Sequence, residues 1–255
     1  MSLTLTPLHH LPLIQQGDDL AEMVASALSQ NHLTLEDQDI LVFAQKIISK
    51  AEGRTVNLVT VHPSPRAIEL GAQIDKDPRL IELILCESRE VLRTRPGTII
   101  VEHKLGFICA NAGIDHSNVA GTGDSNEEWV LLLPEQPDRS AENLRSQIQS
   151  KTGKRIGILI IDSHGRAWRN GTVGVAIGLA GMPGLEDLRG RQDLFDFKLR
   201  ITQVGAADEL AAAASLVMGQ AAEGTPVVHV RGFPYPLREG SLSELIRPKD
   251  QDLFR

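Results

Sequence analysis

The sequence has few cysteines, few aromatic residues and no long apolar stretch. Its 255 residues include two cysteines, Cys86 and Cys109, which predicts two buried reduced thiols rather than a disulfide scaffold or a zinc site. The N-terminal residues lack the basic stretch and apolar stretch of a signal peptide. The longest weakly polar run, residues 172–185, is rich in glycine and shorter than the roughly 20 residues of a membrane helix. We therefore expect a cytoplasmic protein that does not bind membranes.

An excess of positive charge is also absent. The chain has 26 lysine and arginine residues against 33 aspartate and glutamate residues, a formal net charge of −7. Nucleic acids and anionic membranes both require a broad basic surface, so we expect neither as a partner. A local cluster of basic residues would still suffice for an anionic substrate. The hydrophobic fraction of 42% is ordinary for a globular protein with a substantial core.

Several catalytic signatures are missing as well. There is no GxxxxGK[ST] segment, which excludes a Walker-type phosphate loop. The patterns GxSxG and HExxH do not occur, and the eight histidines lack metal-ligand spacing. The glycines between Gly171 and Gly178 do not form a dinucleotide fingerprint after a strand, so we expect them to permit close backbone packing rather than to bind phosphate.

Strand patterns and helix patterns alternate along the chain. Asp19, Ser64 and Asp77 each predict the start of a helix, and proline occupies the first helical position after the last two. We expect the helix after Asp77 to run to about Leu92. Further helices are expected at residues 140–151 and 206–218, and strands at residues 40–43, 98–102, 106–109, 155–161, 197–204 and 226–230. Several strands lie too close together for helical crossovers, which favours a mixed α/β fold over a doubly wound sheet.

Three polar segments follow strands or open a helix. They are residues 111–118, residues 162–166 after the clearest strand, and residues 207–209. Strand ends can hold polar groups rigidly in a cleft. Asp115 and Asp162 offer hard oxygen ligands and Ser163 adds a hydroxyl, a set that suits Mg²⁺ or Mn²⁺ shared with phosphates. An aspartate after a strand is more often a turn former or a helix cap, so the residues alone leave both interpretations open.

A basic cluster at residues 45–54 follows the expected strand at residues 40–43. It contains Lys46, Lys50 and Arg54. Such a run is usually a solvated face. Because these cations adjoin a strand end rather than an exposed helix face, contact with a polyphosphate is an equally good interpretation.

Together these segments resemble one family, the coenzyme F420-0:γ-glutamyl ligases. The resemblance extends from about residue 3 to about residue 246 and covers nearly the whole chain. It is carried by Leu11–Ile14 with Gly17–Leu20, Ser49–Arg54, Asn111–Asp115 with Ser117–Asn118, Asp162–Ser163 with Gly165–Arg166, Gly174–Gly178, Ala207–Glu209 and Val230–Gly232. Each segment alone is a weak signal, whereas seven in this order at matching spacing are a strong one.

The resemblance implies a GTP-dependent ligase that adds L-glutamate to coenzyme F420-0 and then adds further γ-linked glutamates. Such enzymes phosphorylate the terminal carboxylate of a phospholactyl-deazaflavin, and the amine of glutamate attacks the acyl phosphate. Family members bind GTP, two divalent cations (Mn²⁺ or Mg²⁺) and K⁺, and they are homodimers with an α+β fold of mixed sheets. We therefore expect residues 1–255 to form a single ligase domain with two intertwined subdomains, without the C-terminal nitroreductase-like domain of some relatives.

The resemblance also implies roles for individual residues. Asp115 and Asp162 match catalytic, metal-binding aspartates, and Ser163 and Gln220 complete the expected metal ligands. The expected nucleotide-binding residues are Leu11, Pro12, Leu13, Ile14, Gln45, Lys46, Lys50, Asn118, Val217, Met218, Gly219, Gln220, Ala221, Ala222, Glu223 and Gly224. Some relatives carry a glutamate at the position of Gln220, whose amide oxygen can coordinate a metal without adding negative charge. Either the second metal binds more weakly here, or Glu223 replaces the missing carboxylate.

Two other functions are compatible with the sequence. The same ligase chemistry could act on a folate-type or other carboxylated cofactor, because the acceptor pocket cannot be read from the sequence. The chain could also be a nucleotide-binding protein without ligase activity, an alternative that Gln220 keeps open. Comparing acceptors side by side distinguishes the first alternative, and an assay of glutamate transfer distinguishes the second.

Overall fold

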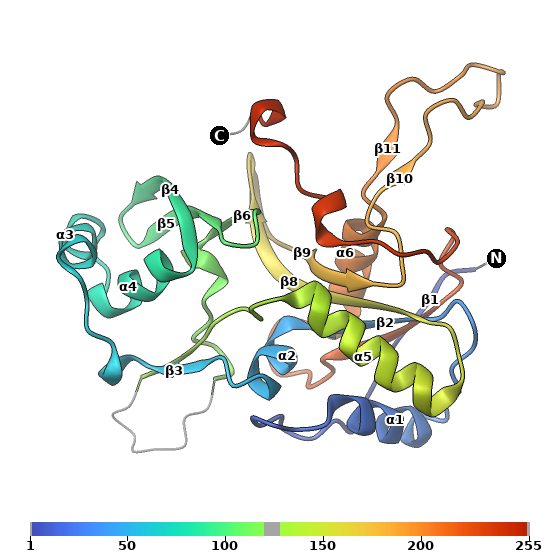
Figure 1. Ribbon diagram of the computed structural model, residues 1–255, viewed down its shortest axis with the longest axis horizontal. Coiled ribbons are helices and arrows are strands. Elements are labelled where there is room, and N and C mark those ends of the chain that lie inside the picture. The colour runs from blue at the N-terminus through green and yellow to red at the C-terminus, as the bar shows by residue number, and fades with distance from the viewer. Residues whose placement is uncertain (1, 120–127, 254–255) are drawn as a thin grey trace.

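A five-stranded mixed sheet forms the centre of the protein in the computed structural model, which describes residues 2–119 and 128–253 (Figure 1). The strand order is β1 (Thr4–Pro7), β12 (Val227–Arg231), β2 (Ile40–Ala44), β8 (Gly157–Arg166) and β9 (Arg169–Ala180). Only β2 and β8 pair in parallel, and the other neighbours are antiparallel. Both β2 and the first half of β8 are continuous apolar runs, as expected for strands that are covered on both faces.

Helices cover the two faces of this sheet. Helices α1 (Leu20–Gln30) and α5 (Pro137–Thr152) pack on one face, and α6 (Ala206–Met218) packs on the other (Figure 1). Apolar side chains fill both interfaces and make two buried clusters. Within the described residues, none of the helices is long and apolar enough to cross a membrane.

A second, smaller core is built from the described part of residues 55–132, on the left of Figure 1. Its elements are β3 (Thr55–Asn57), η1 (Leu58–Thr60), α3 (Pro65–Ile74), α4 (Pro78–Cys86), β4 (Ser88–Arg95), β5 (Thr98–His103), β6 (Ile108–Ala110), η2 (Asn111–Gly113) and β7 (Trp129–Leu131). Strands β4, β5 and β6 form an antiparallel sheet, and β3 pairs with β7. This part of the chain lies between α2 (Gln45–Ala51) and α5. The combination of helices with one mixed sheet and further antiparallel sheets confirms the predicted α+β fold class.

A bulge in β9 explains the closely spaced glycines of that strand. One extra residue, Ile177, lies between the paired positions Ala176 and Gly178. After this bulge, each side chain of β9 points to the face opposite to the one that regular alternation would give. A Cβ atom on Gly174 would lie 2.5 Å from a backbone oxygen of α6, and one on Gly178 would lie 2.5 Å from the Cβ of the first residue of α5. The prediction that these glycines permit close packing is therefore confirmed at both positions.

The predicted end of α4 is wrong. The helix ends at Cys86 rather than at about Leu92, because the chain enters β4 at Ser88 and pairs with β5 from there. No glycine or proline follows the helix until Pro96, so the sequence gives no stop signal at the boundary. The prediction of two buried thiols holds for Cys109 and is wrong for Cys86, which is exposed.

The predicted strand at residues 197–204 is also largely wrong. Only its last two residues form a strand, β11 (Gln203–Val204), which pairs with β10 (Glu186–Asp187). Residues 186–204 form an arm that protrudes at the upper right of Figure 1. Leu194 and Phe195 of this arm are 96% and 89% exposed, so neither side chain is buried against a sheet or a helix of the described residues. The remaining short helices, η3 (Leu242–Glu244) and η4 (Lys249–Gln251), lie in the C-terminal segment.

Candidate functional site

The site begins where β2 ends beside β8, its parallel neighbour in the large sheet. Ala44, the last residue of β2, is paired with Ile161 of β8. Gln45 and Lys46 therefore follow β2 beside the point where β8 presents Asp162 and Ser163. The sequence predicts Asp162 and Ser163 in a loop after a strand, and this is wrong, because β8 continues to Arg166 as a hairpin with β9. Parallel pairing explains why residues far apart in the sequence meet here.

Asp115 is held at this edge by the smaller core. Its backbone exchanges two hydrogen bonds with Leu131, at 3.0 and 2.9 Å, so the residue is fixed beside β7. Gln45 Nε2 donates a hydrogen bond of 2.7 Å to Asp115 Oδ2, and Lys46 Nζ lies 3.4 Å from the same oxygen. Ser49 fixes the amide of Gln45 in turn, by donating a hydrogen bond to its oxygen at 2.9 Å. The carboxylate therefore has one edge occupied by groups of α2.

Asp115 and Asp162 are electrostatic neighbours. Burial and the negative charge of Asp162 together raise the pKa of Asp115 to about 6, against the opposing effects of Lys46 and Gln45. The side chain of Asp162 is only 12% exposed, and its Oδ2 atom lies 2.9 Å from His164 Nε2. A carboxylate whose pKa is raised by a neighbouring carboxylate favours a cation nearby. Within residues 2–119 and 128–253, no three His, Cys, Asp or Glu side chains gather closely enough to form a metal site by themselves.

Ser163 and Gln220 form a separate pair. Ser163 Oγ donates a hydrogen bond of 2.9 Å to Gln220 Oε1, and Gln220 Nε2 donates one of 2.8 Å to Ser215 Oγ in α6. Successive side chains of a strand point to opposite faces, so Asp162 and Ser163 point away from each other. The four expected metal ligands therefore fall into two pairs, Asp115 with Asp162 and Ser163 with Gln220.

Two lysines of α2 point toward the segment that follows Asp115. Lys46 Nζ donates hydrogen bonds to Ser117 O at 3.0 Å and to Ser117 Oγ at 2.8 Å. Lys50 Nζ donates to Asn118 O at 2.7 Å, and its pKa is lowered by burial and by the charge of Lys46. The sequence places these cations beside a strand end rather than on an exposed helix face. Lys46 does follow closely after the end of β2, but both lysines lie on a helix, one turn apart on α2. Their spacing of four residues puts both ammonium groups on one helix face.

The expected phosphate loop, residues 217–224, begins in the last turn of α6. Asn118 Nδ2 donates a hydrogen bond of 3.3 Å to Ala221 O, which connects this loop to the lysines. Glu223 Oε2 accepts a hydrogen bond of 2.8 Å from Ala221 N, and bonds of this kind to the loop backbone lower the pKa of the Glu223 carboxyl. Glu223 is thus turned onto its own loop, whereas Gln220 is turned toward Ser163. Gln220 is the better placed of the two for a ligand at Ser163.

The expected nucleotide segment Leu11–Ile14 lies beside α1 and the end of α2. Leu11 and Ile14 pack into the core there, while Leu13 is 90% exposed. The backbone of the following Gly17 donates a hydrogen bond to Ala51 O at 2.9 Å. This contact lies at the far end of α2 from Gln45, and the role of Leu11–Ile14 in nucleotide binding stays a prediction.

Sequence reasoning missed an aromatic group behind Asp162. The ring of His164 lies 5.2 Å from the ring of Phe107, which stacks at 5.2 Å on the buried ring of His103. Burial, with the charge of His164, lowers the pKa of His103 to about 4. Side chains of a strand alternate between its two faces, so His164 lies on the same face as Asp162. This two-residue period in the sequence could have predicted the contact between them.

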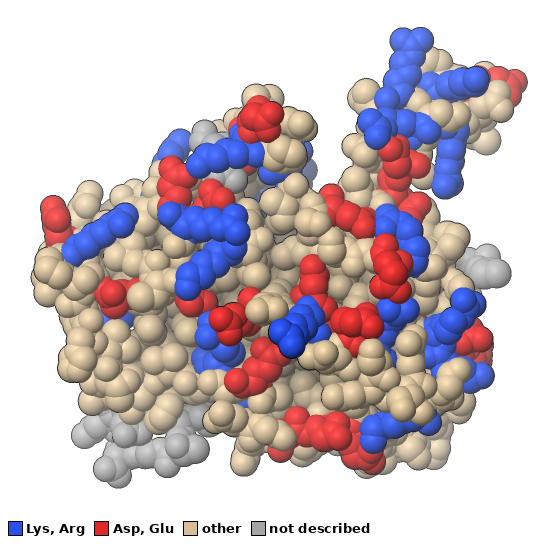
Figure 2. Space-filling model, in the orientation of Figure 1, with Lys and Arg blue, Asp and Glu red and all other residues tan. Residues whose placement is uncertain are grey.

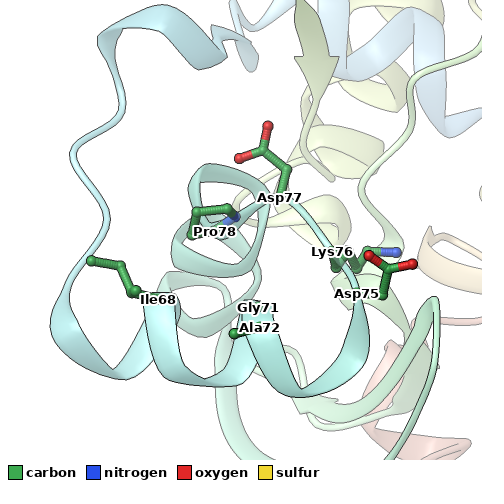
Figure 3. A pocket seen from close by; sticks show the side chains of 7 residues that line it. All are labelled: Ile68, Gly71, Ala72, Asp75, Lys76, Asp77 and Pro78. Carbon is green, nitrogen blue, oxygen red and sulfur yellow. The ribbon is translucent and has the colours of Figure 1, made fainter.

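Two surface hollows lie apart from these residues. One, of about 410 Å³, is bounded by α3 and the start of α4, with Asp75 and Lys76 at the turn between them (Figure 3). The other, of about 450 Å³, lies between the loop after β5, the start of α5 and η3. None of the expected site residues in the described part of the chain lines either hollow.

Comparison with known proteins places these residues in context. The profile of a family described as F420-0:Gamma-glutamyl ligase matches residues 9–232. The chain is similar to a protein of Methanothermobacter thermautotrophicus named coenzyme F420:L-glutamate ligase, with 44% identity over all of both chains. Proteins of the same name from Archaeoglobus fulgidus and Methanopyrus kandleri are 44% and 45% identical, over 100% and 95% of this chain and 97% and 93% of theirs.

Proposed function

The chain belongs to the F420-0:γ-glutamyl ligase family, and we propose that it joins L-glutamate to coenzyme F420-0 with hydrolysis of GTP. Membership of this family makes it an enzyme of the ligase class. The names of its relatives favour the F420 acceptor over a folate-type one. The observation that carries the proposal is the edge of the large sheet, where Asp115 and Asp162 meet beside the lysines of α2.

The chemistry follows from the weakness of a carboxylate as an acylating agent. The γ-phosphoryl group of GTP moves to a carboxylate oxygen of the acceptor and forms an acyl phosphate. The amine of glutamate then attacks the acyl carbon, the carbon–oxygen bond to phosphate breaks, and an amide, a proton, phosphate and GDP result. Catalysis of such a transfer depends mainly on positioning and on stabilisation of charge. Repetition on the γ-carboxylate of the product would add further γ-linked glutamates.

The residues at the sheet edge fit divalent cations. Mg²⁺ and Mn²⁺ bind through one or two carboxylates and share phosphate oxygens, so two carboxylates without a third suit this role. Asp115 and Asp162 would hold one ion, and Ser163 with Gln220 would contribute neutral oxygens toward a second. The ions would offset negative charge on the phosphates during transfer. K⁺ is proposed as the monovalent ion because the family resemblance implies it.

The nucleotide phosphates are assigned to the lysine face of α2. Lys46 and Lys50 bring two positive charges close to the Asp115–Asp162 pair, and Asn118 connects them to residues 217–224. Both ammonium groups donate to oxygens of the segment at residues 117–118. Phosphate oxygens would replace these backbone and hydroxyl acceptors with charged ones, which strengthens each hydrogen bond.

Replacing Lys50 with alanine is expected to weaken GTP binding about ten- to hundredfold, since one charge-assisted contact contributes about 1.5–3 kcal/mol. Calorimetry with GTP and Mg²⁺ measures the change. Lys76→Ala is the matched control, because Lys76 is also partly buried, has a pKa lowered by burial and donates to a backbone carbonyl at 3.0 Å. Equal GTP affinity in Lys50→Ala and Lys76→Ala would remove Lys50 from the nucleotide site.

The acyl phosphate has a direct isotopic test. F420-0 labelled with ¹⁸O in its terminal carboxylate is incubated with the enzyme, GTP, Mg²⁺ and glutamate. Breaking the carbon–oxygen bond of an acyl phosphate leaves one carboxylate oxygen on the released phosphate. We expect one ¹⁸O atom in each phosphate for fully labelled acceptor. If the amide forms and the released phosphate carries no ¹⁸O, the reaction does not pass through an acyl phosphate.

The proposal includes a homodimer, and the arm at residues 186–204 supports it. The arm exposes several large apolar side chains, which soluble proteins seldom leave uncovered in one place. Figure 2 shows lysine and arginine side chains around them, and Arg200 lies 5.6 Å from the ring centre of Phe197. The chain as a whole carries a net charge of −7, so a second copy offers an acidic surface to these cations.

Replacing Phe195 with aspartate is expected to convert the dimer into a monomer at micromolar concentration, because association would then bury an unpaired charge. Light scattering after size-exclusion chromatography measures the mass. Leu253→Asp is the control, since Leu253 is 90% exposed and lies outside the arm. A wild-type monomer, or a Phe195→Asp variant that remains dimeric, would contradict this role of the arm.

A further inference from the structure

The hairpin of β8 and β9 extends past the end of β2 and carries an exposed tryptophan at its tip. Ile161 is the last β8 residue paired with β2, whereas the β8–β9 pairing continues to Arg166 and Arg169 (Figure 1). Trp168 lies in the connecting turn and is 87% exposed. Its φ of 64° is in the left-handed region, which a bulky side chain seldom occupies. A smaller residue would suit both the turn and the exposure, so folding does not explain this tryptophan.

The stem of the same hairpin carries the proposed reaction site. Alternation along β8 places Asp162 and His164 on one face, and the 2.9 Å contact between them agrees with it. A strand advances about 3.3 Å per residue, so Arg166 lies roughly 13 Å from Asp162 along the hairpin. Trp168 lies two residues after Arg166, in the turn of the hairpin. Arg166 and Arg169, both exposed, flank it.

The proposed acceptor has matching dimensions. A phospholactyl-deazaflavin consists of a planar conjugated ring, a ribityl chain, a phosphodiester and a terminal carboxylate. About ten single bonds separate the ring from the carboxyl carbon, and each advances an extended chain by roughly 1.25 Å, which gives a span of about 12 Å. With its carboxylate at Asp162, an acceptor extended along the hairpin would bring its ring to the tip.

We propose that Trp168 is the platform on which the deazaflavin ring of the acceptor stacks, with the arginines at positions 166 and 169 facing its phosphodiester or ring oxygens. The inference depends on the proposed function, because it takes the acceptor and the position of its carboxylate from there. A planar ring stacks on an exposed indole without a preformed pocket. Trp168 thus selects acceptors with a large conjugated ring and acts in binding rather than in phosphoryl transfer.

Steady-state kinetics with F420-0, saturating GTP and saturating glutamate test this role. Trp168→Ala is expected to raise the KM for F420-0 about tenfold or more, as loss of one stacked ring does, with kcat and the KM for GTP within about twofold of wild type. Trp168→Phe should recover most of the affinity, because it keeps an aromatic face. Leu253→Ala, which removes an equally exposed apolar side chain elsewhere, should leave every constant unchanged.

The outcomes distinguish a failure of this inference from a failure of the proposed function. If the wild type does not use F420-0 at all, the proposed acceptor is wrong and the inference fails with it. If the wild type uses F420-0 and Trp168→Ala has an unchanged KM, only the inference is overturned. A Trp168→Ala variant that becomes monomeric would also overturn it, because the tip would then serve the dimer.

Tryptophan fluorescence provides a second readout that a structural role would not change. The chain has two tryptophans, so Trp168→Phe leaves Trp129 as the only indole. Addition of F420-0 without GTP should quench the emission of the wild type, and most of this quenching should be lost in Trp168→Phe. Equal quenching in both proteins would place the ring elsewhere.

Discussion

Asp115→Asn and Asp162→Asn will each lower turnover by about a hundredfold or more while the protein stays folded. Both substitutions keep the size of the side chain and remove one negative charge from the sheet edge, where two carboxylates lie close enough to raise a pKa. Loss of one group that stabilises charge in a transition state lowers kcat by about 10²–10³. Release of phosphate at saturating GTP, glutamate and F420-0 measures turnover, and circular dichroism confirms the fold.

The metal requirement distinguishes this role from a structural one. At limiting Mn²⁺ both variants should be inactive, and Asp162→Asn should need a higher metal concentration for any residual activity, because a neutral amide is a weaker ligand. Asp77→Asn is the matched control, since Asp77 caps α4 and asparagine caps a helix equally well. Full activity of either site variant at limiting Mn²⁺ would remove that aspartate from the metal site.

Asp39→Asn will lower the free energy of unfolding by about 3 kcal/mol at pH 7, as expected when one member of a buried charge pair is lost. Asp39 is 1% exposed, accepts two hydrogen bonds from Arg231 at 2.9 and 2.7 Å, and lies 2.8 Å from His229 Nε2. Burial alone would raise the pKa of Asp39, but the hydrogen bonds from Arg231 and His229 outweigh it and hold the pKa well below its usual value. The ionised carboxylate therefore stabilises the folded state.

The sign of the pH dependence follows from this depressed pKa. The stabilisation is complete above the unfolded pKa of about 3.9 and declines as the pH falls below it. Urea titrations should thus show a difference between wild type and Asp39→Asn that is constant near neutrality and narrows below about pH 4. Asp187→Asn, which alters an exposed pair with Arg189, should show no measurable change. A difference that widens toward low pH would contradict the assignment.

Helix starts could be predicted from the sequence because their causes are local. Ser64 and Asp77 accept hydrogen bonds from the backbone of Ala67 and Arg79, as their side chains and the following prolines indicate. The strands at β2 and β12 were equally visible, because buried strands are short apolar runs between polar turns. The α+β class followed from strands spaced too closely for helical crossovers.

The geometry of the site could not be predicted, because it depends on pairing between distant segments. The parallel pairing of β2 with β8 brings Gln45 beside Asp162, and the pairing of Asp115 with Leu131 holds Asp115 within hydrogen-bond distance of Gln45. The continuation of β8 as a hairpin turns Asp162 and Ser163 to opposite faces. Neither effect leaves a local signal in the sequence. The family resemblance named the expected metal ligands without indicating that they form two pairs, Asp115 with Asp162 and Ser163 with Gln220.

The bulge at Ile177 and the arm at residues 186–204 are two features of the fold that could not be predicted from the sequence either. A single extra residue in β9 decides which glycine faces α5 and which faces α6, and the glycine pattern alone does not reveal it. Residues 197–204 alternate like a half-buried strand, yet they lie in a protruding arm. Alternation of this kind cannot distinguish a strand in a sheet from an exposed segment, because both can carry apolar residues at every second position.

Mass spectrometry of the products tests the proposed function most directly. Purified protein is incubated with GTP, Mn²⁺, L-glutamate and either F420-0 or a folate-type acceptor, with parallel reactions that lack GTP. We predict that F420-0 gains the mass of one glutamyl residue and then of further residues, with one GDP and one phosphate released for each, and that the folate-type acceptor is unchanged. Glutamylation of the folate-type acceptor with F420-0 left unmodified, or addition of glutamate to F420-0 without GTP, would contradict this account.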